Sequence, residues 1–399
     1  MRNRKMPIWA ARAAFILPFA LASWASAQSY TITDLGTFGG TYSQAFGINS
    51  AGQVTGVAYT SQNYDHAFIY TNGAMQDLGS ISGTGGQLNG LSSAGYAINN
   101  AGQVTGFSMT WGSLDRHAIL YSNGVMQDLG TLGGGYFSFG EAINDAGQVT
   151  GYSLTGGEAA YRAFLYTNGA MQDIGTLGGH DSFGHGINAA GQVTGMASTS
   201  GNRDDAFIYT NGVMQDLGTL GGLVSSGNSI NAIGQVTGYS DTSAGAGHAF
   251  LYANGTMQDL GTLGGTASEG MGINSAGQVT GDFTAADGST RAFIFANGSM
   301  QDLNSLLTDP NSGWVLEYGR AINDAGQITG YGTIDGQTHA FLLTPTPEPG
   351  ACAIALVAAL GLLRRRPCCR THLWRWMPPG TSASAAREPR PMSSRPHMS

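Results

Sequence analysis

The feature that most constrains this chain is a five-residue phrase that occurs seven times. "GQVTG", or "GQITG" in the last copy, begins at seven glycines that lie 50, 45, 44, 43, 43 and 49 residues apart: Gly52, Gly102, Gly147, Gly191, Gly234, Gly277 and Gly326. An Ile-Asn pair precedes every copy, and a segment such as "HAFIY" follows it. A period of about 40 to 50 residues indicates one structural unit repeated along the chain.

Each repeat has the pattern of four short strands. The first ends at Ile-Asn, the second is "QVTG", the third is "HAFIYTNG" and the fourth is "MQDLG". The Asn-Gly pair between the third and fourth segments is the strongest short signal for a hairpin. Four-stranded units of this length are typical of the blades of β-propellers. We therefore predict an all-β fold, a seven-bladed β-propeller of seven repeats of about 44 residues.

The two ends of the repeat region complement each other. "TITDLG" at 31–36 has the pattern of a fourth strand but precedes the first repeat, whereas the last repeat ends in "HAFLL" at 339–343 without a fourth strand. An unpaired edge strand is a liability for a protein. An open solenoid would gain nothing from such a displaced strand. We expect the N-terminal strand to complete the last blade and to close the propeller.

The first 27 residues have the pattern of a secretory signal peptide. Three basic residues precede the apolar run "AAFILPFALASW", and the small residues Ala25 and Ala27 precede a cleavage point at Gln28. This combination predicts recognition by signal peptidase and export of the chain.

Charge and cysteine usage narrow the functional classes. Residues 28–344 contain five Arg, no Lys and 23 Asp or Glu, a net charge of −18. Nucleic-acid binding requires a basic surface, so we exclude it. All three cysteines, at 352, 368 and 369, follow the repeats, so the exported domain has no disulfide to rely on and must be stabilised by burial.

Two segments resemble known families. "HAFLYANGTMQDLGTLGG" at 248–265, together with the "AGQVTG" phrase, resembles the HAF repeats of bacterial extracellular proteins, and this likeness spans 30–343. It implies secretion and names no substrate. "TPEPGACAIALVAALGLLRRR" at 346–366 resembles a PEP-CTERM sorting signal. Its defining residues are Pro347, Glu348, Pro349, Arg364, Arg365 and Arg366.

The second resemblance implies recognition by an exosortase and a Gram-negative host, often one that makes exopolysaccharide. Residues 351–363 would form a transient membrane anchor, although 13 residues make a marginal span. We divide the chain into a signal peptide (1–27), the repeat domain (28–344), a sorting segment (345–366) and a tail (367–399). The tail is basic and rich in Pro and Ser, which predicts disorder, and it extends beyond the point where such signals normally end.

The recurring polar residues have structural explanations. The histidine of "HAF" is replaced by Arg162, Asp205 and Arg291 in three repeats. A position that accepts all three residue types is expected at a strand entrance near solvent, and not as a catalytic base. The aspartate of "MQDLG" recurs in every repeat, so we expect it to cap a turn or bind backbone amides. Calcium is the alternative there, but no dense run of ligands is present. We predict no catalytic residue, no metal and no cofactor.

The connections between strands vary, and function is often found in loops on a rigid scaffold. They carry aromatic residues beside carboxylates, a combination that suits sugars or a protein partner. The candidate ligand-binding residues are Trp111, Asp115, Asp181, Trp314, Glu317 and Tyr318. His180, Asp181 and His185 are a weak candidate for metal ligation.

Three functional hypotheses remain open from the sequence. The first is a non-enzymatic surface or matrix protein that binds exopolysaccharide or a surface protein through the variable loops. The second is a purely structural surface component. The third is a secreted polysaccharide hydrolase or lyase, which would require non-repeating acids to converge. The candidates for such acids are Glu141, Glu158, Glu269 and Glu317.

Overall fold

The computed structural model describes residues 28–81, 91–110, 115–157 and 160–346. The chain divides into two compact units, Met1–Thr346 and Pro347–Ser399. The predicted signal peptide, with Ala25 and Ala27, and the sorting signal from Pro347 onward lie outside the described residues. No helix within the described ranges is long and apolar enough to cross a membrane.

The described residues are almost entirely β-structure, in four-stranded antiparallel sheets. The sheets in chain order contain the following strands: β2 (Gly39–Ile48), β3 (Val54–Thr60), β4 (Asp65–Thr71) and β5 (Ala74–Asp77); β6 (Ser93–Ile98), β7 (Val104–Met109), β8 (Arg116–Ser122) and β9 (Val125–Asp128); β10 (Ser138–Ile143), β11 (Val149–Leu154), β12 (Tyr161–Thr167) and β13 (Ala170–Asp173); β14 (Gly178–Ile187), β15 (Val193–Thr199), β16 (Asp204–Thr210) and β17 (Val213–Asp216); β18 (Gly221–Ile230), β19 (Val236–Thr242), β20 (Gly247–Ala253) and β21 (Thr256–Asp259); β22 (Ala267–Ile273), β23 (Val279–Thr284), β24 (Thr290–Ala296) and β25 (Ser299–Asp302); β26 (Val315–Ile322), β27 (Ile328–Ile334), β28 (Gln337–Pro345) and β1 (Tyr30–Asp34).

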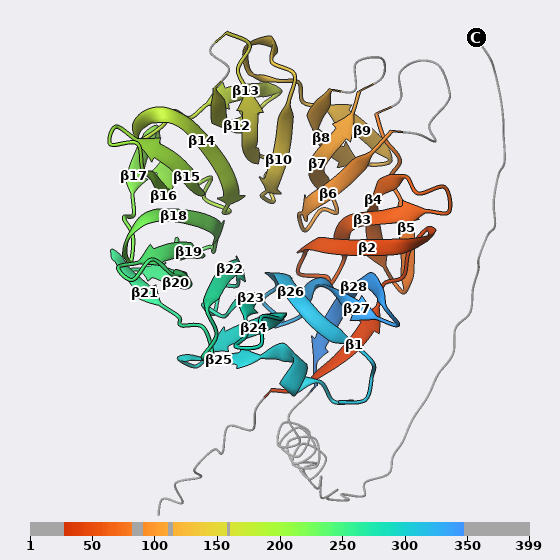
Figure 1. The fold of residues 1–399 in the computed structure, drawn as a ribbon. Helices are drawn as coiled ribbons and strands as arrows, with labels where there is room; N and C mark the ends of the chain where they lie inside the picture. The colour runs from red at the N-terminus through yellow and green to blue at the C-terminus, as the bar shows by residue number, and fades with distance from the viewer. Residues whose placement is uncertain (1–27, 82–90, 111–114, 158–159, 347–399) are drawn as a thin grey trace, which may run out of the picture. The chain divides into compact units, whose positions relative to one another are not determined.

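Two short 3-10 helices, η1 (Leu132–Gly134) and η2 (Leu303–Leu306), occur in connections between sheets. The sheets follow one another around a common centre, and the first strand of each sheet lies nearest to it (Figure 1). The last sheet takes its fourth strand from the N-terminus, because β1 pairs antiparallel with β28. This is the strand pairing expected from the sequence. A single parallel pair, Tyr42 with Thr338, links this sheet to the first one.

The turns follow from the residues that occupy them. In the Asn-Gly hairpins both residues adopt positive φ, for example 52° at Asn72 and 81° at Gly73, as the favoured two-residue hairpin turn requires. The second glycine of "GQVTG" is needed for a different reason. A Cβ on Gly56 would lie 1.9 Å from the Gln44 carbonyl oxygen of the neighbouring strand, so only glycine fits.

The core is distributed between neighbouring sheets. The phenylalanine of "AF" is fully buried in six repeats, and Ile119 takes its place in the second. The valine of "QVTG" packs with these rings, as Val193 does with Phe207. This arrangement explains why both faces of the strands carry apolar or small residues.

A ring of hydrogen bonds connects the sheets near their centre. The asparagine of every Ile-Asn pair donates from Nδ2 to the backbone oxygen of the corresponding asparagine in the next repeat, at 3.0 to 3.2 Å. The last of these bonds, from Asn323 to the carbonyl of Asn49 at 3.0 Å, returns to the first repeat. The Oδ1 atom of each asparagine accepts two backbone amides of its own turn, as Asn49 does from Ala51 and Gln53.

We expect deletion of Gln28–Gly36 to destabilise the whole repeat domain, because it removes β1 and the fully buried Tyr30 side chain. Loss of one buried large side chain alone costs about 3 to 5 kcal/mol. Thermal unfolding followed by circular dichroism should therefore show a much lower melting temperature. Thr31→Val, which removes only one exposed hydrogen bond, is the matched control. An unchanged melting temperature of the deletion variant would refute this role of β1.

Candidate functional site

Every innermost strand contains a β-bulge at the same repeat position, two residues before the Ile-Asn isoleucine. A bulge adds one unpaired residue to a strand and redirects its side chain. The bulged residues, which we call the bulge ring, are Phe46, Tyr96, Glu141, His185, Asn228, Met271 and Arg320.

All seven residues of the bulge ring line one cavity of about 640 Å³, together with isoleucines of the Ile-Asn pairs. This volume is within the usual range for small-molecule sites, about 300 to 1,000 Å³. The seven bulge-ring residues all differ from one another, although the backbone geometry at the seven positions is alike.

The residue that follows each bulge is always Gly, Ala or Ser. A Cβ on Gly47 would lie 3.0 Å from the Ala97 Cα of the next inner strand, and a Cβ on Gly272 would lie 2.9 Å from the Ala321 Cα. The close approach of neighbouring inner strands therefore demands a small residue here. The preceding position, in the bulge ring, has no such restriction.

One part of the cavity wall is aromatic. The Phe46 ring packs edge-on against Tyr96 at 5.5 Å and against Tyr331 at 6.4 Å between ring centroids. Tyr318 stacks on Tyr331 at 4.5 Å, and Tyr96 continues the series to Phe107 at 5.8 Å. Phe46, Tyr96 and Tyr331 line the cavity directly, so a bound molecule would meet apolar rings on this side.

Another part of the wall is polar and uncharged. Asn228 donates from Nδ2 to Glu269 Oε1 at 2.8 Å and to the Gly270 carbonyl at 3.1 Å. His185 Nδ1 lies 3.3 Å from the Ser226 hydroxyl. Burial lowers the pKa of His185 to about 4. A hydrogen bond with the Gly227 backbone favours the charged form and partly opposes this shift. The imidazole is therefore neutral near pH 7 and can both donate and accept a hydrogen bond.

Charged groups complete the cavity. Burial raises the pKa of Glu141 to about 7, and the positive charge of Arg320 opposes this shift. Burial and the charge of Glu269 raise the pKa of Asp282 to about 7, again against Arg320. The Arg320 guanidinium lies over the Phe46 ring, with Cζ 5.5 Å from the ring centroid. Within the described part of the chain it forms neither a hydrogen bond nor an ion pair with a carboxylate.

The candidate residues around β26 are mostly engaged elsewhere. Trp314 packs edge-on against Phe341 at 6.0 Å, beside a hydrophobic core cluster. Glu317 accepts a hydrogen bond from the Thr333 hydroxyl at 2.9 Å. Tyr318 reaches the cavity wall through its stacking on Tyr331. Of these three, only Tyr318 therefore contributes to the central site.

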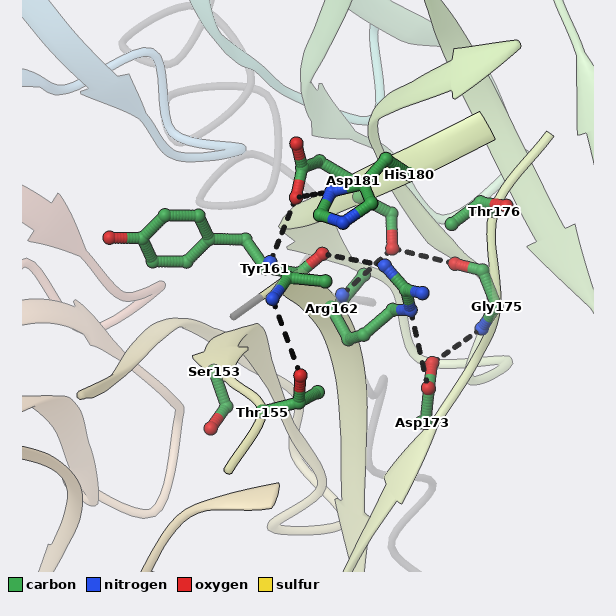
Figure 2. A network of polar contacts seen from close by, with 12 residues as sticks. Ser153, Thr155, Tyr161, Arg162, Asp173, Gly175, Thr176, His180 and Asp181 are labelled. Carbon is green, nitrogen blue, oxygen red and sulfur yellow. Dashed lines mark hydrogen bonds and ion pairs between the residues drawn. The ribbon is translucent and has the colours of Figure 1, made fainter. Parts of the chain in front are cut away.

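The remaining candidate residues that the structure describes, Asp115, Asp181 and His180, do not line this cavity. Trp111 and Glu158 lie outside the described residues. The Asp115 carbonyl accepts from the Thr110 amide at 2.8 Å. Asp181 accepts from the Tyr161 amide at 2.9 Å and contacts His180 Nδ1 at 3.0 Å (Figure 2). His185 lines the cavity instead, and in the described ranges His180, Asp181 and His185 form no group able to hold a metal ion.

The histidine of "HAF" and the aspartate of "MQDLG" form a pair in four of the sheets. His66, His117, His248 and His339 bind Asp77, Asp128, Asp259 and Asp34 with Nδ1–Oδ2 distances of 2.9 Å. Arg162 takes the histidine's place opposite Asp173 (Figure 2). The aspartates also accept the amide of the glycine two residues on, so the turn-capping prediction is confirmed. The predicted location of the histidines near solvent is wrong for His66, which is buried against Asp77.

The sequence contains a signal for the bulge ring, and this signal lies in the repeated strands and not in the variable loops. The position two residues before each Ile-Asn isoleucine differs in all seven repeats, whereas the isoleucine never varies. Within a repeat protein, a position that differs in every copy, although both of its neighbours are always small residues, is a candidate for binding. Two of the four non-repeating glutamates are near the cavity: Glu141 lines it, and Glu269 holds Asn228.

No family model matches this chain, and no curated protein matches it. Among solved structures, the chain is similar to TolB from Acinetobacter baumannii, at 12% identity and a TM-score of 0.41 over 78% of this chain and 65% of that one. It is also similar to YCF48 bound to D1 peptide, at 8% identity and a TM-score of 0.47 over 81% of this chain and 98% of that one. A third similar structure is an Aleuria aurantia lectin in complex with α-methyl-L-fucoside, at 10% identity and a TM-score of 0.35 over 69% of this chain and 94% of the lectin. At these TM-scores the likenesses carry no argument about function.

The fourth full repeat departs from the His–Asp pattern, because Asp205 faces Asp216. Burial raises the pKa of Asp205, the charge of Asp216 raises it further, and Arg203 opposes both. A raised carboxyl pKa means that ionisation destabilises the folded state, so the penalty is absent below the unfolded-state pKa and complete above the folded-state pKa.

We therefore expect Asp205→Asn to stabilise the protein at pH 7 by roughly 1 kcal/mol, the usual scale for a substitution that relieves an unfavourable site. The gain should disappear at pH 3, where the wild-type carboxyl is protonated in both states. Urea unfolding at the two pH values measures this difference. Asp145→Asn is the control, because Asp145 accepts hydrogen bonds from Asn100, is not among the charges that act on Asp205, and should not gain stability. Equal stability of wild type and Asp205→Asn at pH 7 would contradict the expectation.

Proposed function

We propose that this chain is an exported surface- or matrix-associated protein that binds carbohydrate, as part of a polysaccharide, in its central cavity. The observation that carries the proposal is the bulge ring. Seven positions with alike backbone geometry face one cavity and carry seven different side chains. A protein that serves only as a structural component would have no reason to place seven different side chains at seven alike backbone positions that face a single cavity.

The chemistry of the cavity supports carbohydrate as the ligand class. Sugars present apolar ring faces and many hydroxyl groups, so their sites combine aromatic side chains with amide and carboxyl groups. Phe46, Tyr96 and Tyr331 supply the rings, while Asn228 and Glu141 supply hydrogen-bonding groups. The loops around the cavity, together with Tyr318 on strand β26, would contact the rest of the polymer.

We also propose that the repeat domain is a closed seven-bladed β-propeller of the HAF-repeat type. The pairing of β1 with β28 and the asparagine bond from Asn323 back to Asn49 support closure. The strand sets of the seven repeats support the blade number. Export by signal peptidase with cleavage before Gln28, and sorting by an exosortase at Pro347–Glu348–Pro349, remain proposals based on the sequence alone.

A secreted hydrolase or lyase is the second candidate, and one observation favours it. A carboxyl whose pKa is about 7, as burial makes that of Glu141, suits a general acid at neutral pH. Incubation with the host's exopolysaccharide followed by assay of new reducing ends and unsaturated products tests this candidate. Turnover that Glu141→Gln abolishes would replace binding with catalysis as the function.

We expect residues 28–346 to pull down the producing organism's exopolysaccharide in a saturable manner. Asn228→Ala should weaken binding at least tenfold, since it removes a hydrogen-bonding group at the cavity wall, without unfolding the protein. Trp314→Phe is the matched control, because this ring packs against Phe341 and not on the cavity. Loss of binding only in variants of the loops would place the site there, and absence of binding by the wild type would refute the proposal.

A further inference from the structure

The most unusual side chain of the cavity is Arg320. It is the only Arg or Lys among the described residues that line the cavity, and its aliphatic stem comes from the bulge of β26. The guanidinium stacks over Phe46 but forms no hydrogen bond or ion pair with the rest of the described chain. Arg320 is half-buried and lines the cavity, so the five N–H donors of its guanidinium stay accessible to an acceptor that enters the cavity. Its position therefore suggests an acceptor that a ligand supplies.

From these contacts we propose that the cavity binds a hexuronate residue of the polysaccharide, with the sugar carboxylate on the Arg320 guanidinium. This inference rests on the proposed carbohydrate-binding function and names the class of sugar. The planar fork of an arginine matches a carboxylate through two parallel hydrogen bonds, which a lysine cannot reproduce. Its stacking on Phe46 orients the fork before the ligand arrives.

The groups around Arg320 fit the remainder of such a sugar. The Phe46 and Tyr96 rings offer apolar faces to a pyranose ring, and they lie 5.5 Å apart in an edge-on arrangement. Glu141 offers carboxyl oxygens, and Asn228 and the neutral His185 offer amide and imidazole groups, to the hydroxyls. The cavity of about 640 Å³ has room for one or two sugar residues.

The other acids explain why a single carboxylate is favoured over a more highly charged group. Arg320 interacts electrostatically with both Glu141 and Asp282, and the charge of Glu269 acts on Asp282. They would repel a phosphate monoester, which carries nearly two negative charges at neutral pH, more strongly than a carboxylate. Burial raises the pKa of Glu141 and of Asp282 to about 7, so both are partly protonated at neutral pH and repel one carboxylate less.

The test uses matched pairs of small ligands with residues 28–346. Methyl β-D-glucuronide and methyl α-D-galacturonide are compared with methyl β-D-glucoside and methyl α-D-galactoside by ligand-observed NMR titration. We expect at least one uronide to bind tenfold more tightly than its neutral partner. Arg320→Gln should abolish this preference by weakening uronide binding more than glycoside binding, and Arg320→Lys should restore the preference only in part.

Arg116→Gln is the control for general charge, because Arg116 is an exposed residue over Phe107 outside the cavity lining. Thermal unfolding of every variant identifies any that fails to fold, and Arg320→Met then serves as the replacement because it keeps the apolar stem. Equal binding of uronide and glycoside, or a preference that survives Arg320→Gln, would overturn the inference and leave the carbohydrate proposal intact. No binding by any of the four probes would count against both.

Discussion

The side-chain amide of one asparagine per repeat is the interaction on which the rest of the domain depends. Its Oδ1 fixes the tight turn of its own repeat and its Nδ2 fixes the next repeat, so one residue sets both the local and the inter-sheet geometry. These amides are buried, and a buried amide without its partners would cost about 1 to 3 kcal/mol. The bond from Asn323 to Asn49 makes the ends of the chain interdependent in the same way. The pairing of β1 with β28 adds a second link between those ends.

The fold could be predicted from the sequence because its determinants are local and recur. The Asn-Gly turn occurs in six repeats and the "GQVTG" or "GQITG" phrase in all seven, so each local prediction is supported several times along the chain. The displaced fourth strand was readable for the same reason, since "TITDLG" matches six other segments. The paired role of the "HAF" histidines was harder to see. It depends on the register of two strands, which pairs Phe68 with Asp77 and so brings His66, two residues earlier, within hydrogen-bond distance of the Asp77 carboxylate.

The candidate site could be predicted only in part, and the reason is physical. The aromatic and acidic residues of the loops are the candidates that sequence reasoning favours, because binding sites often occur in loops. Trp314 and Glu317 are instead engaged with Phe341 and Thr333. The cavity is built by residues about 45 positions apart, and their convergence follows from the bulges, which no local pattern announces. Glu141 and Glu269 were recognised as non-repeating residues, but nothing in the sequence related either one to Arg320.

The bulge ring also gives the domain a direction that its repeats lack. If the seven repeats were identical, a rotation by one repeat would present the same side chains to a ligand. Because Arg320, Glu141 and Phe46 each occur once in the bulge layer, only one rotational setting presents them in a given order. A substitution at any bulge would change the side chains that a ligand meets in the cavity. The asparagines that link the repeats and the glycines of the strands would stay the same. Because the contacts between repeats are constant and the bulge-ring residues are not, substitutions in the bulge ring would alter the chemistry of the cavity without a change in the architecture.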